Sequence, residues 1–462
     1  MSSEILVPFH GPGAGVAELS WGQREIWTAM RAQESSLSGG SMAPLPEGKG
    51  LDYAASLLSY LMGRYPSFRT RLRFEPDGTV RQVLSDQGEI PLHVVDAPDD
   101  ADPARVAETV RERYVATVFD YEHEWPIRMA VIRHHGAATH LVAVHCHLAM
   151  DGGGFQAVAA DLGSFDDYQV RTDDEPVQNP IDQVRWQQGP AGQRHRAMVV
   201  RHWRKLLARV PTNRFGHTDD ERRPRYWRVT GNSPAAHLAM RAIAGQVGRP
   251  DTSPILMTAA AVALARVTGI SPSVLKVLVS NRFRPGMATT ASPIAQSGLC
   301  AIDVGGDTFA EVVDRTSRSL MSAYLNAYYD PTEMDEVIAE LGRERGAPID
   351  LDCFFNDRRD QAGREYAGTP PTEDEVRAAA RTTLTWGPHS DTPSPRFYVH
   401  VIDVPDTIEL LVFADTRYLP PGDVAEFFRR FEQILIEAAS DPTVPTGIPA
   451  GEPTPVAGRS PV

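Results

Sequence analysis

The sequence predicts an α/β protein built from two halves of similar construction. With 462 residues, the chain is too long for one ordinary hydrophobic core, so two domains or two packed subdomains are expected. Helix-like and strand-like hydrophobic periods recur in both halves. Each half also contains a strongly apolar strand that ends in polar residues, at 141–151 and at 274–286. These observations suggest a functional site where the two halves meet.

The first half alternates helix and strand signals. Residues 51–64 carry apolar side chains at helical spacing and stop at Tyr65-Pro66, because a proline disfavours helix in the residue before it. Residues 68–84 alternate around Pro76-Asp77-Gly78, which predicts a hairpin. Two strands and a helix are expected next, at 125–133, 139–146 and 155–162. The second of these strands is apolar on both faces and should be a buried central strand.

The second half repeats this type of construction with a different sequence. Residues 253–268 form a strongly apolar helix that ends at Gly269, and a buried strand follows at 274–281. The helix at 424–439 has Asp423 as its expected N-cap, with Glu426 three residues later. A hairpin across Pro405-Asp406 is expected from 396–403 and 407–416.

These patterns divide the chain into three parts. One subdomain is expected at 1–180, a second at 181–440, and a disordered tail at 441–462. The tail is proline-rich and too poor in apolar residues to build a core. Residues 165–193 are polar and turn-rich, which suggests a connector between the halves.

Composition excludes several classes of protein. The net charge of -14 argues against nucleic-acid binding, because contact with phosphates needs a basic surface. No run of about 18 apolar residues is present, so no membrane partner is expected. The N-terminus lacks the pattern of a signal peptide, which favours a cytoplasmic protein. Three scattered cysteines, Cys146, Cys300 and Cys353, form neither a disulfide framework nor a zinc pattern.

Residues 194–209 stand out as a basic amphipathic helix within this acidic chain. Two interpretations are open for this segment. It is either a solvated face that balances acidic neighbours or a docking face for an acidic partner.

Residues 145–154 place two histidines, a cysteine, an aspartate and three glycines directly after a buried strand. Such a strand holds its last residues rigidly, so His147 is well placed for a catalytic role. Asp151 follows across a tight loop, and Gly152 to Gly154 allow backbone N–H groups to lie near the imidazole. The arrangement suits activation of a nucleophile and stabilisation of an oxyanion.

The residues alone leave other interpretations of this segment open. A histidine four residues before an aspartate is expected by chance in a chain of this length, so a structural His147 is one alternative. Metal binding by His145, Cys146, His147 and Asp151 is disfavoured, because adjacent strand residues point to opposite faces. A nucleophilic Cys146 competes with simple packing of a buried thiol.

The segment from Cys146 to Gly152 resembles the H-H-x-x-x-D-G signature of the condensation domains of nonribosomal peptide synthetases, which belong to the chloramphenicol acetyltransferase-like acyltransferases. Cys146 stands in place of the first histidine. Other stretches resemble further motifs of the family in the same order: LSWGQREIW at 19–27, LLSYLMGRYPSFRTRL at 57–72, and 255–282, which ends at Arg282. The resemblance runs from about residue 19 to residue 440.

This resemblance implies a fold and roles for individual residues. It implies two chloramphenicol acetyltransferase-like subdomains in a V, with an active-site tunnel between them. His147 would position or deprotonate the acceptor, and the Gly152 N–H would be an oxyanion donor. Asp151 would form a structural ion pair with Arg282. The residues assigned to the substrate tunnel are Cys146, Phe283, Gln296 and Ser297.

The resemblance also implies partners. No metal and no tightly bound cofactor are expected, and the phosphopantetheine thioester would come on a carrier protein in trans, because the chain has no G-G-x-S carrier motif and no adenylation domain. The D-F-G-W-G motif of coenzyme A-dependent relatives is absent, and the segment at Thr385 is a poor copy. The expected protein is a free-standing enzyme of natural-product biosynthesis that joins an acyl or aminoacyl thioester to a small-molecule amine or alcohol.

A rival hypothesis is a degenerate condensation-like domain that serves as a docking platform for a partner enzyme. Cys146 favours this rival, as does the loose match of 292–303 to the family's G-x-F-x-N-T-x-P stretch. The intact His147, Asp151 and Gly152 favour the enzyme. An epimerase of the same fold is disfavoured, because such domains normally occur within synthetase modules.

Overall fold

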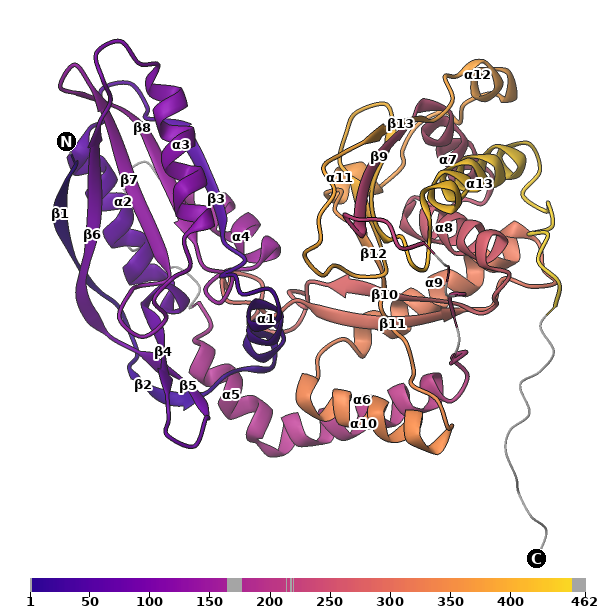
Figure 1. The fold of residues 1–462 in the computed structure, drawn as a ribbon, viewed down its shortest axis with the longest axis horizontal. Coiled ribbons are helices and arrows are strands. Elements are labelled where there is room, and N and C mark those ends of the chain that lie inside the picture. The colour runs from indigo at the N-terminus through magenta and orange to yellow at the C-terminus, as the bar shows by residue number, and fades with distance from the viewer. Residues whose placement is uncertain (1, 164–176, 213, 217, 219, 451–462) are drawn as a thin grey trace, which may run out of the picture. The chain divides into compact units, whose positions relative to one another are not determined.

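The computed structural model describes residues 2–163, 177–212, 214–216, 218 and 220–450 (Figure 1). Its contacts divide the chain into two compact units. Unit 1 comprises Met1–Ala197, Ser280–Gln296 and Tyr328–Thr332, and unit 2 comprises Met198–Val279, Ser297–Ala327 and Glu333–Val462. We expected the boundary at residue 180. Unit 1 instead extends to Ala197 and takes two short segments from the second half of the sequence.

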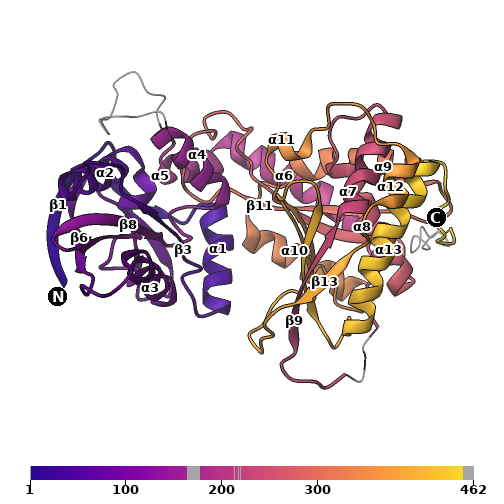
Figure 2. The ribbon, with the colours of Figure 1, turned by 90° about the horizontal axis from the view of Figure 1, so that it is seen from above.

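Unit 1 contains a five-stranded sheet with a helix on each face (Figure 2). The strand order is β1 (Ser2–His10), β6 (Gln87–Asp96), β7 (Ile127–His134), β8 (Ala137–His145) and β3 (Gly39–Pro44). Helix α2 (Leu51–Arg64) packs on β1, β6 and β7, and α3 (Pro103–Ala116) packs on β3, β7 and β8. The strand predicted to be central is β8, and the middle strand of the sheet is its neighbour β7.

The predicted hairpin is confirmed. Strands β4 (Thr70–Phe74) and β5 (Val80–Leu84) pair antiparallel, and β2 (Gly15–Glu18) completes this small sheet. Gly78 closes the turn with φ +84°, a left-handed conformation that glycine adopts without strain. Unit 1 also contains α1 (Trp21–Ala32), α4 (Gly152–Gly163), α5 (Pro180–Gln188) and the start of α6 (Pro190–Leu207). The expected connector therefore contains helix from residue 180, and its residues 165–176 lie outside the described part of the chain.

Two sequence motifs of unit 1 have structural roles. In LSWGQREIW, Ser20 and Gln23 form the capping box of α1, and the Gln23 side chain also bonds Gln82. Arg69 is fully buried and donates to the carbonyls of Met62 (2.6 Å) and Pro12 (2.9 Å). Burial lowers the pKa of Arg69 to about 10, so its guanidinium is still charged at neutral pH. These residues hold loops and helix ends together.

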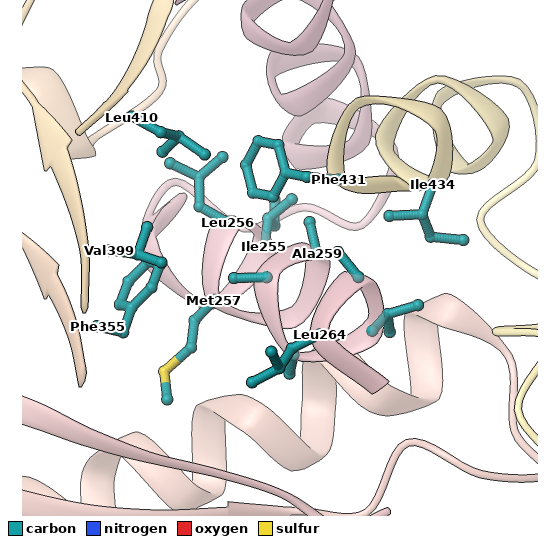
Figure 3. Close-up of a cluster of buried hydrophobic side chains, with 14 of the residues drawn as sticks. Ile255, Leu256, Met257, Ala259, Leu264, Phe355, Val399, Leu410, Phe431 and Ile434 are labelled. Carbon is teal, nitrogen blue, oxygen red and sulfur yellow. The ribbon is translucent and has the colours of Figure 1, made fainter. Parts of the chain in front are cut away.

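Unit 2 is built around a seven-stranded sheet. The strand order is β11 (Gln296–Ile302), β10 (Ser273–Val279), β12 (Cys353–Asp357), β14 (Phe397–Ile402), β15 (Ile408–Asp415), β9 (Tyr226–Ser233) and β13 (Thr383–Trp386). Helix α8 (Ser253–Thr268) is buried at every residue from Ser253 to Ala265. Figure 3 shows its Met257 near Phe355 and Val399 of the sheet, and Phe431 and Ile434 belong to the same core. This helix is the centre of the larger core.

The predicted helix end at Gly269 and the hairpin β14–β15 are confirmed. The predicted N-cap of α13 (Pro421–Ser440) is wrong: the cap is Pro420, and Asp423 lies in the first turn. Pro421 allows the earlier start, because its fixed φ suits the first helical position. The remaining helices of unit 2 are α7 (Pro234–Gln246), α9 (Phe309–Leu325), α10 (Pro331–Glu344), α11 (Gln361–Arg364) and α12 (Glu373–Ala378).

The tail prediction is wrong for residues 441–450. Thr446 is fully buried, donates its backbone N–H to Asp307 O (3.1 Å) and its hydroxyl to Val304 O (2.6 Å). Gly306 N–H donates to Ile448 O (2.9 Å). These contacts fix the segment although its composition is proline-rich; residues 451–462 lie outside the described part. Among the described helices, none combines the length and the apolar character that crossing a membrane requires.

Candidate active site

The loop after β8 carries the predicted site residues. Strand β8 ends at His145, and α4 begins at Gly152. Backbone hydrogen bonds hold the loop on both sides: Cys146 N–H donates to Pro126 O (3.0 Å), and His147 N–H donates to Ser36 O (3.2 Å). The loop side chains from Leu148 to Met150 are buried. His147 therefore lies two residues beyond the strand that we expected to hold it, and backbone hydrogen bonds of the loop fix its position.

Asp151 is the anchor of this loop. Its side chain is only 4% exposed, and Arg282 Nη2 lies 2.6 Å from its Oδ1. The same oxygen accepts Gly154 N–H (2.7 Å), and Oδ2 accepts the N–H groups of Ile294 (3.1 Å) and Ala295 (3.0 Å). With its acceptor positions filled by four donors, this carboxylate is placed to hold structure and not to exchange protons.

Arg282 is equally well held. Its Nη2 also donates to Thr290 O (3.0 Å), and the side chain is 12% exposed. Arg282 is therefore not an exposed loop charge. Arg282, Ile294 and Ala295 come from Ser280–Gln296, the segment of the second half of the sequence that belongs to unit 1.

His147 is partly exposed, and its Nδ1 is buried without a hydrogen-bond partner among the described residues. The neighbouring carboxylate of Asp151 is already engaged by Arg282 and three backbone N–H groups. The imidazole is thus not oriented by a carboxylate as in a Ser-His-Asp triad. Nearby His145 adds no charge at neutral pH, since burial, followed by the influence of His147, lowers its pKa to about 4.

Cys146 does not face a substrate space. It is 1% exposed and packs in the cluster beneath α3, together with Val142, Val144 and Leu148. Burial raises the pKa of its thiol to about 12, so the reactive thiolate is scarce at neutral pH. This burial contradicts the assignment of Cys146 to the substrate tunnel and favours a packing role for the thiol over a nucleophilic one.

Cys146→Ala should retain turnover within about threefold, because the thiol only fills core space and the change removes one sulfur atom. The check is steady-state kinetics together with intact-mass analysis of the protein during turnover. An acyl adduct on Cys146, or complete loss of activity in a stable variant, would establish thiol chemistry instead.

The three glycines differ in their surroundings. A Cβ on Gly154 would lie 2.1 Å from Ala291 O, and one on Gly153 would lie 2.5 Å from Arg282 Nη1. A Cβ on Gly152 would meet nothing within 4 Å. Gly153 and Gly154 therefore allow α4 to approach the Arg282 segment closely, whereas Gly152 faces open space.

Gly154→Ala should lower the free energy of unfolding by about 1–3 kcal/mol, because backbone has to move to admit the methyl group. Gly152→Ala is the matched control and should be tolerated, with its backbone N–H preserved. Denaturant unfolding of both variants measures the difference. Equal stability of the two would mean that α4 does not pack as closely as described.

A family model for the condensation domain matches residues 16–447. The chain belongs to the condensation domain family. A curated relative is the AMB antimetabolite synthetase AmbB of Pseudomonas aeruginosa, which is 31% identical over 154 residues. That match covers 33% of this chain and 12% of AmbB, so the chain spans only a small part of its relative.

Solved structures of other condensation-type proteins share the fold. The condensation domain that mediates chain release from the enacyloxin polyketide synthase gives a TM-score of 0.66 at 17% identity, over 97% of this chain and 86% of that one. SgcC5 from Streptomyces globisporus gives a TM-score of 0.64 at 18% identity, over 93% of this chain and 100% of SgcC5. The X-domain from teicoplanin biosynthesis gives a TM-score of 0.67 at 19% identity, over 93% of this chain and 96% of the X-domain. The chain therefore has the α/β fold of condensation domains, with two chloramphenicol acetyltransferase-like halves.

The other residues assigned to a tunnel of this condensation domain lie in different environments. Gln296 is fully buried, and its amide exchanges two hydrogen bonds with the backbone of Tyr329 and donates to Glu25 (2.9 Å). Ser297 is 2% exposed. Both placements contradict a substrate-facing role. Phe283 is 59% exposed, so it is not a core residue.

The sequence did not predict that the backbone N–H groups of Ile294 and Ala295 bind Asp151 Oδ2. The N–H groups of Ile294 and Ala295 carry no side-chain signal that would identify them. Asn281 was the available signal, because an asparagine tolerates a left-handed conformation at the end of a strand. It is fully buried with φ +57°, and its Nδ2 donates to Ile294 O (2.8 Å), which orients this backbone.

Proposed function

We propose that this condensation domain joins an acyl or aminoacyl thioester, carried by a phosphopantetheine arm on a separate carrier protein, to an amine or alcohol. The observation that carries the proposal is the loop anchored by Asp151 and Arg282, which holds a partly exposed His147 beside the start of a helix. A rigid imidazole close in sequence to the N-terminal N–H groups of a helix suits acyl transfer. Family membership supports the same reaction class.

In the proposed reaction, Nε2 of His147 accepts the proton of the acceptor, because Nδ1 is buried. The acceptor nitrogen or oxygen then forms a bond to the thioester carbonyl carbon. The Gly152 N–H donates to the developing oxyanion. The carbon–sulfur bond breaks, and the proton held by His147 passes to the departing sulfur. General-base assistance of this kind contributes on the order of 10²–10⁴-fold.

A docking platform is the second candidate function. The cysteine at the first position of the signature favours it, and the chain is similar to the X-domain solved in complex with OxyB from teicoplanin biosynthesis, with a TM-score of 0.66 over 96% of this chain. The two functions differ in a simple readout. An enzyme transfers the acyl group to an acceptor, whereas a platform binds its partner and transfers nothing.

The recognition of a carrier is proposed to use α6. Arg201 and Lys205 are exposed one turn apart on α6, the exposed Met198 lies one turn before Arg201, and the exposed Arg209 follows in the turn after the helix. Arg204 is less suitable, because it pairs with Glu340. An acidic carrier protein fits this combination of positive charge and an apolar contact.

Charge reversal at Arg201 and Lys205 should lower kcat/KM for a carrier-bound donor about tenfold at low salt, with a smaller difference at high salt. The wild-type chain and the charge-reversed variant should use an N-acetylcysteamine thioester equally well, because this donor has no carrier protein. Arg381→Glu, an exposed arginine elsewhere in unit 2, is the matched control. Equal use of coenzyme A and carrier thioesters would contradict the carrier donor, and carrier binding without any transfer would favour the platform.

A further inference from the structure

Unit 2 contains a cavity of about 260 Å³ that none of the preceding roles uses. Its walls are α7, the start of α8, the loop after β12 and the β14–β15 turn. All of its lining residues belong to unit 2, and none of them comes from the loop that carries His147. At about 30 Å³ per water molecule, the space admits roughly eight waters or a ligand of amino-acid size.

Unpaired polar atoms are concentrated in this cavity. Among the described residues, twelve buried side-chain nitrogen or oxygen atoms have no hydrogen-bond partner, and four of them belong to residues that line it. These are His237 Nε2, Arg241 Nε and the hydroxyls of Tyr366 and Thr407. Buried polar groups normally find partners, so such a concentration indicates a ligand that completes them.

The four groups share one chemical capacity. Arg241 Nε can only donate, and the two hydroxyls and a neutral imidazole can each donate one hydrogen. His237 and Arg241 lie one turn apart on α7, and the Arg241 guanidinium lies 5.1 Å from the centre of the Tyr366 ring. The donors thus come from neighbouring side chains. They suit the two oxygens of a carboxylate, which prefer several donors.

The rim of the cavity is negatively charged, whereas the Arg241 guanidinium inside it is positive. Glu365, Asp403 and Asp406 line it and are exposed. Arg359, the other cation of the lining, is already paired with Asp357 at 2.7 Å. A simple anion would meet one arginine inside and three carboxylates at the entrance. A ligand with an ammonium group close to its carboxylate satisfies both regions.

We propose that unit 2 binds a small zwitterion of the α-amino acid class in this cavity. The ligand carboxylate accepts hydrogen bonds from Arg241, Tyr366 and Thr407, and its ammonium group faces Asp403 and Asp406. The site is independent of acyl transfer at His147.

The test is isothermal titration of the full chain with a panel of free α-amino acids, alongside acetate and methylamine as probes that carry one of the two charged groups. We expect one-to-one binding of at least one amino acid, and binding of acetate and methylamine at least about tenfold weaker, a difference of about 1.4 kcal/mol. Arg241→Gln should weaken the binding of the amino acid at least about tenfold, and Tyr366→Phe should weaken it about threefold. Arg343→Gln removes an exposed charge outside the cavity and should have no effect.

Thermal unfolding of each variant without ligand establishes that it is folded, and bound ligand should raise the Tm of the wild-type chain. The variant His147→Ala should bind the amino acid normally, which separates this site from the proposed transfer reaction. Absence of binding up to about 10 mM for every amino acid would mean that the cavity holds only water. Unchanged affinity in Arg241→Gln would also overturn the proposal.

Discussion

Replacing His147 with alanine should leave the fold intact and lower kcat by about 10²–10⁴-fold. The imidazole is the only part of the anchored loop proposed to exchange a proton with the acceptor, since Asp151 is fully engaged by four donors. The fold should tolerate the change because the side chain is partly exposed and its Nδ1 makes no hydrogen bond within the described residues. The measurement is product formation from a loaded carrier protein and an acceptor amine.

His123→Ala is the matched control, because this histidine is exposed and its imidazole contacts the exposed Asp120. It should retain full turnover. Near-normal turnover in folded His147→Ala would show that the assignment is wrong. If carrier binding persists while neither the wild-type chain nor the variant transfers an acyl group, the docking platform becomes the better account.

Much of the fold was predictable because local chemistry decides it. The hairpin at Pro76–Gly78 and the helix end at Gly269 depend on glycines that adopt positive φ, and both were predicted from the sequence. The edge strand β1 was not predicted, since its nine residues gain their order from pairing with β6. Residues 441–450 were assigned to a disordered tail because composition does not reveal tertiary hydrogen bonds.

The candidate site was predictable in part for a similar reason. The His147 loop follows a strand whose apolar pattern is visible in the sequence, and the resemblance identified Arg282 as the partner of Asp151. The burial of Gln296 and Ser297 was not visible, because it depends on Tyr329 and other residues that the fold brings close. Side-chain environment is a property of tertiary packing, which a single sequence does not display.

The ion pair between Asp151 and Arg282 should be the most costly contact of the site to break. Asp151→Asn and Arg282→Ala should each lower the free energy of unfolding by about 3–5 kcal/mol, because each leaves a buried group without its charged partner. Asn adds a second penalty, since both oxygens of Asp151 accept hydrogen bonds, and the NH₂ group of the amide would face donors in either orientation. Arg282→Ala leaves Thr290 O without its donor.

The double variant should cost less than the sum of the two single variants, with a coupling of about 1–3 kcal/mol, because removing both partners leaves no uncompensated charge. Urea unfolding of the wild-type chain, the two single variants and the double variant measures the four free energies of unfolding that the comparison needs. The exposed pair of Arg377 and Glu373 on α12 is the control, and its cycle should be additive within error, since solvent screens charges at 64% and 47% side-chain exposure. Additivity at Asp151 and Arg282 would mean that the two side chains do not depend on each other. The anchor of the His147 loop would then be the backbone N–H groups around Asp151 alone.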